Sequence, residues 1–429
     1  MYSTIIQPFI NNAIYKIYFT YSCLFCNFNL SIIVVFNMFY PRKILTSVEK
    51  HLNRKQITVI TGMRRTGKTT IVKKLLKNIE SQNKFYLDLE RMDNRELFSE
   101  KNYDNITYPL SQRGLDFKKK TYIVIDEIQF VPNSVSVLKY LYDHYDIKFI
   151  VTGSSSYYLK NLFSESLSGR KKIFEIYPLD FAEMLTFNNI EFKPADFINT
   201  NIISSEYERL KYYYDQYIEY GGFPEVVLSS DISEKKDILQ DIISSYINID
   251  IATLSDFRNP KNLYNLLKLL AVRTGSRIDV SKLSSLSKLS RATVNNYIDF
   301  FEKTYILKTI PVISTSPDRE IVKAKKVYFY DNGMVNALAD LSSGAKFENA
   351  VFTQLNQFGI LNYFSLKSGK EIDFILDKKN AFEVKESPSE GDLKNLDRIS
   401  KKVNIKQQRL VGRHLVPIFN NYIWGGDIK

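Results

Sequence analysis

The chain contains the stretch Gly62-Met63-Arg64-Arg65-Thr66-Gly67-Lys68-Thr69, which follows the pattern Gly-x-x-x-x-Gly-Lys-Thr of a phosphate-binding loop. The residues just before it, 56–60, are rich in β-branched side chains and suit a buried strand. Those just after it, 71–76, are apolar at helical spacing. The motif requires this order of strand, glycine loop and helix, so a chance glycine turn is the weaker interpretation.

Each residue of the loop has a predicted role. Gly62 and Gly67 allow backbone N–H groups to turn toward an anion, and the helix N-terminus adds partial positive charge. Lys68 would reach the β- and γ-phosphates of ATP, and the hydroxyl of Thr69 would bind Mg²⁺. Arg64 and Arg65 either contact phosphate or face solvent. The nucleotide-binding candidates in and beside the loop are Gly62, Arg64, Arg65, Thr66, Gly67, Lys68, Thr69 and Thr70.

Length and charge set broad limits. With 429 residues the chain is long enough for two or three domains, and an apolar content of 44% suffices for their cores. The net charge of +12 favours polyanionic partners such as nucleic acid or a membrane surface, although a lysine-rich composition alone could produce it. Cys23 and Cys26 are the two cysteines, which argues against a disulfide framework and against a structural zinc site, and fits a reducing cytosol.

The first forty residues differ from the rest, because Lys16 is their one charged residue. Residues 17–39 are apolar and aromatic and long enough to span a bilayer. Three interpretations compete: a membrane anchor, a signal-like segment, or a translation start at Met38. We favour the start at Met38 and a cytoplasmic protein; a membrane location depends on residues 1–40 being a real anchor.

Apolar runs at 85–89, 121–125 and 148–152 predict further strands, which alternate with helical segments and so indicate a parallel sheet. Ligands of such sheets bind at the carboxyl ends of the strands. Asp126 and Glu127 follow one of these runs. We expect Asp126 to hold magnesium and Glu127 to orient and deprotonate the attacking water, the alternative being ordinary surface acids.

Two more polar positions belong to this hypothesis. Ser154 follows the strand that begins at Lys148 and could touch the γ-phosphate or the water; the alternative is a simple polar turn. Arg170 could stabilise developing charge as an arginine finger, in its own chain or in a neighbouring one, and otherwise is a solvated or structurally paired arginine.

Beyond about residue 178 the pattern becomes helical, interrupted by the turn Gly221-Gly222-Phe223-Pro224. Residues 263–273, 280–286 and 291–303 predict three helices, the last capped by Ser290, and 306–313 with 325–330 predict two strands. This order resembles a winged helix. Its third helix carries Arg291, Asn295, Asn296 and Lys303, which could contact DNA, although winged helices also serve as protein-contact modules.

The whole pattern resembles a widespread archaeal and bacterial family of AAA-type ATPases that carry a C-terminal domain of unknown function. The residues that carry the resemblance are 62–69, 125–129, 152–155, 167–170 and the stretch Tyr220-Gly221-Gly222-Phe223-Pro224-Glu225. The resemblance covers about residues 41–425 and implies an ATPase module, a winged helix and a restriction-endonuclease-like end. The resemblance indicates the bound nucleotide and the domain architecture more firmly than it indicates the cellular role.

The C-terminal segments at 371–376 and 380–385 predict neighbouring strands that carry Asp373 and Glu383-x-Lys385. This resembles the Asp…Glu-x-Lys pattern of restriction-endonuclease-like folds, and strand alternation puts Glu383 and Lys385 on one face. Asp373 and Glu383 would hold magnesium, Glu348 could complete the site, and Lys385 could position the water. The alternative is a pair of strands with solvated charges.

We therefore expect an α/β protein with a P-loop parallel-sheet core. The predicted divisions are an apolar extension at 1–40, an AAA-type ATPase domain at 41–178, a helical region at 179–262, a winged helix at 263–341 and a restriction-endonuclease-like domain at 342–429. The predicted function is ATP hydrolysis, with ATP and Mg²⁺ as cofactors, coupled to a DNA transaction, with a metal-dependent nuclease site and a homo-oligomeric form as further hypotheses. The alternative is a regulatory ATP switch that controls protein assembly.

Overall fold

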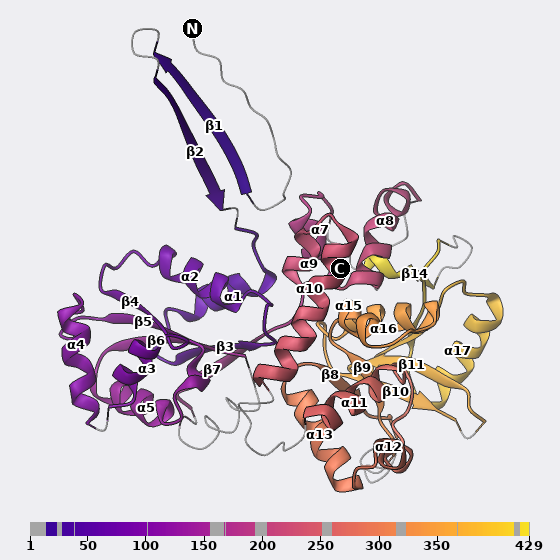
Figure 1. The fold of residues 1–429 in the computed structure, drawn as a ribbon. Coiled ribbons are helices and arrows are strands. Elements are labelled where there is room, and N and C mark those ends of the chain that lie inside the picture. The colour runs from indigo at the N-terminus through magenta and orange to yellow at the C-terminus, as the bar shows by residue number, and fades with distance from the viewer. Residues whose placement is uncertain are drawn as a thin grey trace.

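The computed structural model describes residues 14–23, 28–37, 39–100, 102–154, 167, 169–193, 204–250, 260–314, 323–366, 368–415 and 421–428. Of residues 14–37 and 249–250 it describes the backbone alone. Two masses are visible in Figure 1, with residues 43–176 on the left and the elements that follow them on the right. The mixed α/β class predicted from the sequence is confirmed, with one parallel sheet and a separate C-terminal α/β region.

A five-stranded sheet organises the N-terminal mass. All its neighbouring strands pair in parallel, in the order β4-β5-β6-β3-β7. The strands are β3 (Ile57–Gly62), β4 (Lys84–Asp88), β5 (Thr121–Asp126), β6 (Ile147–Gly153) and β7 (Lys171–Ile176). Since β6 lies between β3 and β5, the loop after β3 and the acids after β5 flank the carboxyl end of β6.

Helices cover both faces of this sheet (Figure 1). One face packs on α1 (Lys43–His51) and α2 (Lys68–Asn78), and the other packs mainly on α3 (Met92–Phe98) and α5 (Ser134–His144). Alternating residues of β3 enter the two cores, with Val59 on one face and Ile60 on the other. The short elements η1 (Tyr103–Ile106), α4 (Thr107–Gln112) and η2 (Ile128–Phe130) complete this part.

The helical region that follows begins with a well-capped helix, α7 (Phe181–Phe187), where Asp180 and Glu183 form a capping box. Three further helices follow: α8 (Ser204–Tyr220), α9 (Pro224–Leu228) and α10 (Ile232–Ser245), which continues as the π-helix η3 (Tyr246–Asp250). The turn between α8 and α9 requires glycine at 222, because a Cβ there would lie 2.0 Å from the carbonyl oxygen of Leu179.

Three helices and a two-stranded antiparallel sheet come next. They are α11 (Pro260–Ala271), α12 (Val280–Ser287), α13 (Arg291–Lys303), β8 (Leu307–Ile310) and β9 (Lys326–Phe329), followed by α15 (Asn332–Leu338). Ser290 caps α13 by accepting from the backbone N–H of Thr293, as the sequence predicts. Apolar residues of α10, α11, α13, β9 and α15 share one core.

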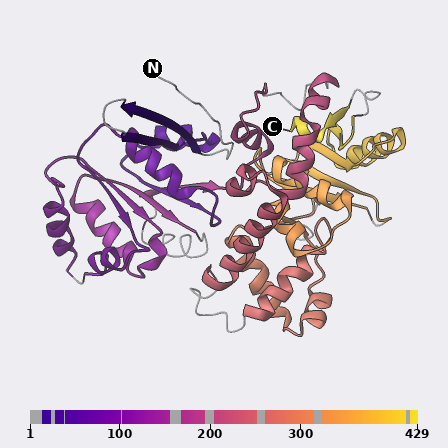
Figure 2. The same cartoon turned by 45° about the horizontal axis from the view of Figure 1, so that its top comes forward.

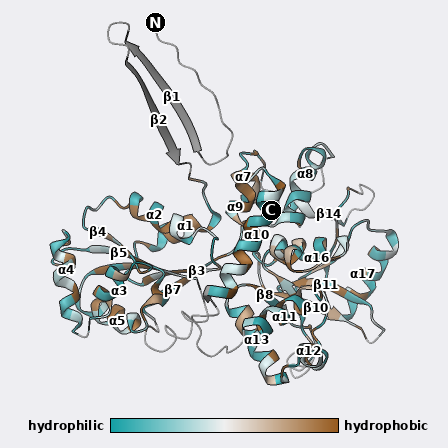
Figure 3. Ribbon diagram, viewed as in Figure 1, coloured by the Kyte–Doolittle hydropathy of each residue, from teal (hydrophilic) through white to brown (hydrophobic). Residues whose placement is uncertain are grey.

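The C-terminal region is a second five-stranded sheet, in the order β10-β11-β12-β13-β14. Its elements are α16 (Ser343–Leu355), β10 (Leu361–Ser365), β11 (Glu371–Leu376), β12 (Asn380–Lys385), α17 (Glu390–Lys402), β13 (Gln407–Gly412), β14 (Tyr422–Trp424) and η4 (Gly425–Asp427). Its core extends into α7 and α8, where Phe181 and Tyr214 pack around Trp424. Figure 2 shows α7 and α8 beside this sheet, and Figure 3 shows apolar stretches in α7 and in the strands of the sheet.

The N-terminal extension contains two antiparallel strands, β1 (Ile14–Cys23) and β2 (Phe28–Asn37). The residues predicted to form a membrane span, 17–39, thus fall mostly in strands. None of the helices that the structure describes is both long and apolar enough to cross a membrane. Met38 lies outside the described residues.

Candidate nucleotide site and C-terminal acid cluster

The phosphate-binding loop lies between β3 and α2, as its motif requires. Gly67 precedes α2 in the left-handed conformation, with a φ of 93°, which glycine adopts without strain. At Gly62 a Cβ would lie 2.0 Å from the carbonyl oxygen of Ile176, so the adjacent strand β7 leaves no room for a side chain. Glycine is therefore needed at position 67 for its backbone conformation and at position 62 because a neighbouring strand lies too close for a side chain.

The lysine and the threonines of the loop differ in how deeply they are buried. Lys68 is buried, and its Nζ donates to the carbonyl oxygens of Gly62 (3.0 Å) and Met63 (2.9 Å). Thr69 is half-buried and Thr70 is exposed in the first turn of α2. Thr66 is buried and donates to the carbonyl oxygen of Met63 at 2.8 Å, so its hydroxyl shapes the loop itself.

The two arginines of the loop point toward acids on different elements. Arg64 Nη1 lies 3.8 Å from Glu90, whose pKa is raised by burial and by Glu127. Arg65 is exposed and lies 3.5 Å from Glu225, which belongs to the Gly-Gly-Phe-Pro-Glu stretch of the helical region. Arg65 is exposed and Arg64 is half-buried, and either side chain could turn toward phosphate.

Asp126 ends β5 with both carboxylate oxygens engaged. Tyr86 Oη donates to its Oδ2 at 2.6 Å, and Thr152 Oγ1 donates to its Oδ1. The pKa of Tyr86 is raised by burial and by this bond, so the phenol stays a donor. Tyr86 on β4 is a site residue that sequence reasoning missed, and only its position in an apolar strand next to β5 could have indicated it.

Glu127 and Ser154 meet through one side chain. Gln129 Nε2 donates to the Glu127 carboxylate and to Ser154 Oγ, the latter at 3.0 Å. The backbone N–H of Glu127 donates to Thr152 Oγ1 at 3.0 Å, and Glu127 has a φ of 56°, which turns the chain sharply after β5. The structure therefore brings Asp126, Glu127 and Ser154 together at the carboxyl ends of β5 and β6.

Magnesium would suit the nucleotide site. Asp126 offers a carboxylate and Thr69 a hydroxyl, and both are oxygen ligands of the kind that Mg²⁺ takes together with substrate phosphates. The hydrogen bonds from Tyr86 and Thr152 hold the Asp126 carboxylate in one orientation.

Arg170 is not part of this site in its own chain. It precedes β7, and its backbone oxygen accepts from Ile57 N, at the amino end of β3, whereas the phosphate-binding loop follows the carboxyl end. The length of β3 separates the two ends by roughly 17 Å at about 3.3 Å per residue. Its guanidinium pairs with Asp143 at 3.0 Å. Arg170 thus lies at the end of the sheet opposite the phosphate-binding loop, so it cannot serve as an arginine finger for the site of its own chain.

A second residue that sequence reasoning missed joins the loop to the helical region. Arg42 is buried, donates to the carbonyl oxygens of Thr66 (2.8 Å) and Tyr177 (2.7 Å), and pairs with Glu183 at 2.9 Å. Met63 of the loop belongs to the apolar core that α10, α11, α13, β9 and α15 share. The loop is therefore held by the helical region as well as by its own sheet.

The C-terminal acids surround an ammonium group. Lys326 Nζ lies 2.8 Å from Glu371, 3.6 Å from Glu348 and 3.6 Å from Asp373. Although burial acts to lower it, the pKa of Lys326 is raised by these carboxylates. Lys385 Nζ lies 2.7 Å from Glu383 and 3.9 Å from Asp373. Glu371 and Lys326 were not among the predicted residues.

The predicted magnesium ligands Glu348, Asp373 and Glu383 do not fit a metal in this arrangement. Among the described residues, no group of three or more His, Cys, Asp or Glu side chains is arranged to hold a metal ion. Burial and Asp373 raise the pKa of Glu348 to about 7 and that of Glu383 to about 8. The raised values come from burial and from repulsion between neighbouring carboxylates.

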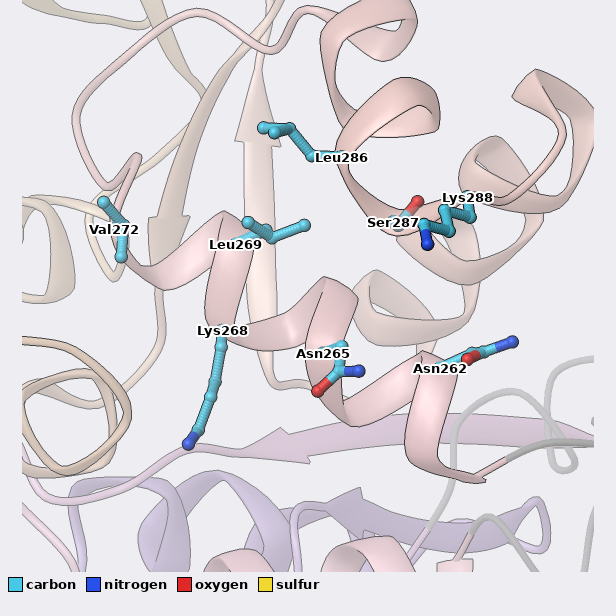
Figure 4. A pocket seen from close by; sticks show the side chains of 8 residues that line it. All are labelled: Asn262, Asn265, Lys268, Leu269, Val272, Leu286, Ser287 and Lys288. Carbon is cyan, nitrogen blue, oxygen red and sulfur yellow. The ribbon is translucent and has the colours of Figure 1, made fainter.

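A surface depression of about 540 Å³ lies between α11 and α12. Figure 4 shows Leu269 on α11 and Leu286 on α12 among the lining side chains, together with Lys268 and Lys288. Val272 and Leu286 are 61% and 53% exposed, which is high for apolar side chains. The depression belongs to the predicted winged helix.

Comparison with known families divides the chain into three matched segments. Residues 54–185 match a family described as AAA domain. Residues 211–345 and 343–421 match two families that are each described as a domain of unknown function, DUF8612 and DUF4143.

Relatives extend over most of the chain. An uncharacterized protein of Methanocaldococcus jannaschii is 28% identical over 382 residues, covering 85% of this chain and 83% of that protein. An uncharacterized protein of Haemophilus influenzae is 27% identical over 379 residues, covering 83% and 89%. Among solved structures, the Aeropyrum pernix ORC1 protein in complex with DNA matches with 15% identity and a TM-score of 0.33, covering 68% of this chain and 90% of that one. A TM-score this low does not establish a common overall fold.

Proposed function

We propose that this chain, a P-loop ATPase of the AAA type with a C-terminal DUF4143 domain, binds ATP with Mg²⁺ and hydrolyses it in a DNA transaction. One observation carries the proposal. The carboxylates of Asp126 and Glu127 and the hydroxyl of Ser154 gather at the sheet edge where Lys68 and Thr69 follow β3. Binding phosphate at that edge puts an activated water within reach of a carboxylate.

The positions of these side chains support a separate role for each. Lys68 can exchange its two backbone carbonyl acceptors for the β- and γ-phosphates, because an ammonium prefers charged acceptors. Asp126, held by Tyr86 and Thr152, would keep Mg²⁺ in place with Thr69. Glu127 would take the proton of the attacking water, and Gln129, which donates to both the Glu127 carboxylate and Ser154 Oγ, would hold that carboxylate in place. For Arg170 we keep only the role of an arginine finger that acts on the nucleotide site of a neighbouring copy of the chain.

The coupling to DNA is supported by the region at 263–341. Its order of three helices and two strands fits a winged helix, and Arg291, Asn295 and Asn296 lie exposed on α13. The net charge of +12 adds a general attraction to phosphate. The C-terminal acid cluster, in contrast, gives no support for including DNA cleavage in the proposal.

The first experiment tests hydrolysis. Lys68→Ala should abolish tight ATP binding, because it removes the cation nearest the β- and γ-phosphates. Glu127→Gln should bind ATP as the wild type does and turn it over at least about a hundredfold more slowly, because the base is lost and the shape is kept. Unchanged turnover by Glu127→Gln would refute the role of Glu127.

The second experiment tests the coupling. Steady-state turnover is measured with and without single-stranded, duplex and branched DNA for the wild type, for Arg291→Ala/Asn296→Ala, and for Lys394→Ala on α17, which removes one exposed positive charge elsewhere. We expect DNA to stimulate the wild type and Lys394→Ala and to have less effect on the α13 variant. No stimulation by any DNA would refute the coupling.

A second candidate function is a regulatory ATP switch with little turnover. The observations that favour it are the packing of Met63 in the core shared by α10, α11, α13, β9 and α15, and the Arg65–Glu225 pair, because both connect the phosphate-binding loop to another region. A switch would change assembly or partner binding on nucleotide addition and show slow turnover whether or not DNA is present. Light scattering with and without ATP, beside the turnover assay, distinguishes the two functions.

A further inference from the structure

Lys326 is a buried charge whose partners all come from outside its own strand. Its side chain is 2% exposed, at the start of β9. Glu371 and Asp373 reach it from β11, and Glu348 reaches it from α16. Three carboxylates from β11 and α16 thus surround one ammonium, which belongs to a different segment of the chain, β9.

The backbone of β9 holds Lys326 in that position. Lys326 pairs with Ile310 of β8, and its strand neighbour on the same face, Tyr328, donates to Glu348 Oε1 at 2.6 Å. Phe329 N donates to Asn349 Oδ1 of α16 at 2.8 Å. Since both side-chain and backbone bonds join β9 to α16, Lys326 enters the cluster as part of a packed strand.

The charges of the cluster are balanced by side chains. Lys326 forms ion pairs with Glu348, Glu371 and Asp373, and Lys385 forms ion pairs with Glu383 and Asp373. Arg277 adds a contact of 3.2 Å to Glu371. Three cationic groups therefore face four carboxylates, which leaves little of the negative charge that would attract a divalent ion.

A divalent ion and this ammonium compete for the same oxygens. Mg²⁺ needs near-octahedral oxygen ligands at about 2.0–2.1 Å, and the Lys326 Nζ already lies within 4 Å of three of the carboxylates. Two like charges a few Å apart in a buried site repel strongly. We infer that the ammonium of Lys326 occupies the position in this cluster that a metal ion would otherwise take. Its ion pairs also attach the β8–β9 hairpin to the C-terminal sheet.

The inference does not rest on the proposed ATPase function, and metal binding tests it directly. Mn²⁺ is titrated calorimetrically into the full chain without nucleotide, for the wild type, Asp373→Asn, Lys326→Met and Lys326→Met/Asp373→Asn. Lys325→Met is the matched control, because it removes the same charge from the exposed neighbouring position. We expect wild type, Asp373→Asn and Lys325→Met to give identical isotherms. Lys326→Met should gain one Mn²⁺ site, and the added Asp373→Asn should remove that site.

Two results would overturn the inference. One is Mn²⁺ binding by the wild type that Asp373→Asn abolishes, because the cluster would then take a metal with Lys326 in place. The other is a folded Lys326→Met protein that gains no site. If Lys326→Met does not fold, the comparison of wild type with Asp373→Asn decides alone, since both keep the ammonium.

Discussion

Replacing Arg42 with methionine should destabilise the junction between the phosphate-binding loop and the helical region. The guanidinium of Arg42 donates to Thr66 O and Tyr177 O and pairs with Glu183, and both charged side chains are less than a tenth exposed. Methionine keeps much of the apolar stem and removes every one of these donors. The change therefore isolates the charge and hydrogen bonds of Arg42 from its volume.

The expected magnitude follows from the partners that remain. Removing one partner of a buried ion pair costs about 3–5 kcal/mol, because the other charge is left buried. Glu183 would still accept from Lys43 N at 2.8 Å and from Asp180 N at 3.4 Å. We therefore expect a loss near the lower end, about 3 kcal/mol in the free energy of unfolding.

Urea unfolding followed by tryptophan fluorescence measures this loss. Trp424 is the single tryptophan of the chain, is 1% exposed, and has its ring centroid 6.4 Å from that of Phe181, which begins α7. Its emission therefore reports on the core into which α7 packs. Arg54→Met, which removes the same charge from an exposed position, is the control and should change stability by less than about 0.5 kcal/mol.

A double-mutant cycle with Glu183→Gln completes the test. The two positions should couple by about 1–3 kcal/mol, because they are in direct contact. If Arg42→Met unfolds at the same urea concentration as Arg54→Met, or if the two single effects add without coupling, the reasoning from burial and geometry is refuted.

Two further predictions concern other buried polar groups. Tyr86→Phe keeps the ring and removes the bond to Asp126, so Mg²⁺-dependent ATP turnover should fall roughly tenfold, and a Mg²⁺ titration identical to that of the wild type would contradict this. Burial raises the pKa of Asp331 to about 6, above the value of about 3.9 in an unfolded chain. The folded protein then holds a proton that the unfolded chain releases between about pH 4 and 6, so the contribution of Asp331 to stability is full below pH 4 and declines, by at most about 3 kcal/mol, as the pH rises through 6. Asp331→Asn should show a smaller decline between pH 4.5 and 7 in urea unfolding, and an equal decline in both proteins would rule the assignment out.

Local elements were predictable because their determinants lie within a few residues. The glycines and Lys-Thr of the first motif, between a β-branched run and a helical run, predicted the β3–loop–α2 unit. Ser290 marked the start of α13, and the apolar alternation around Asp373 marked β11. Strand β7 was missed, because Lys171, Lys172 and Glu175 interrupt a run of six residues. The predicted domain divisions and the roles of the site residues remain predictions.

The contacts that give the sites their chemistry depended on tertiary structure. Arg42 and Glu183 are 141 residues apart, and nothing near either one indicates the other. Arg170 lies near a predicted catalytic segment in sequence, yet the parallel strand that follows it begins at the edge opposite the phosphate-binding loop. Whether a carboxylate holds magnesium or an ammonium is likewise decided by what the fold brings beside it. The sequence by itself determined which chemical groups are available, and the order of strands and the packing of β9 on α16 decided which of them meet, because charge interactions depend on distance and burial in space.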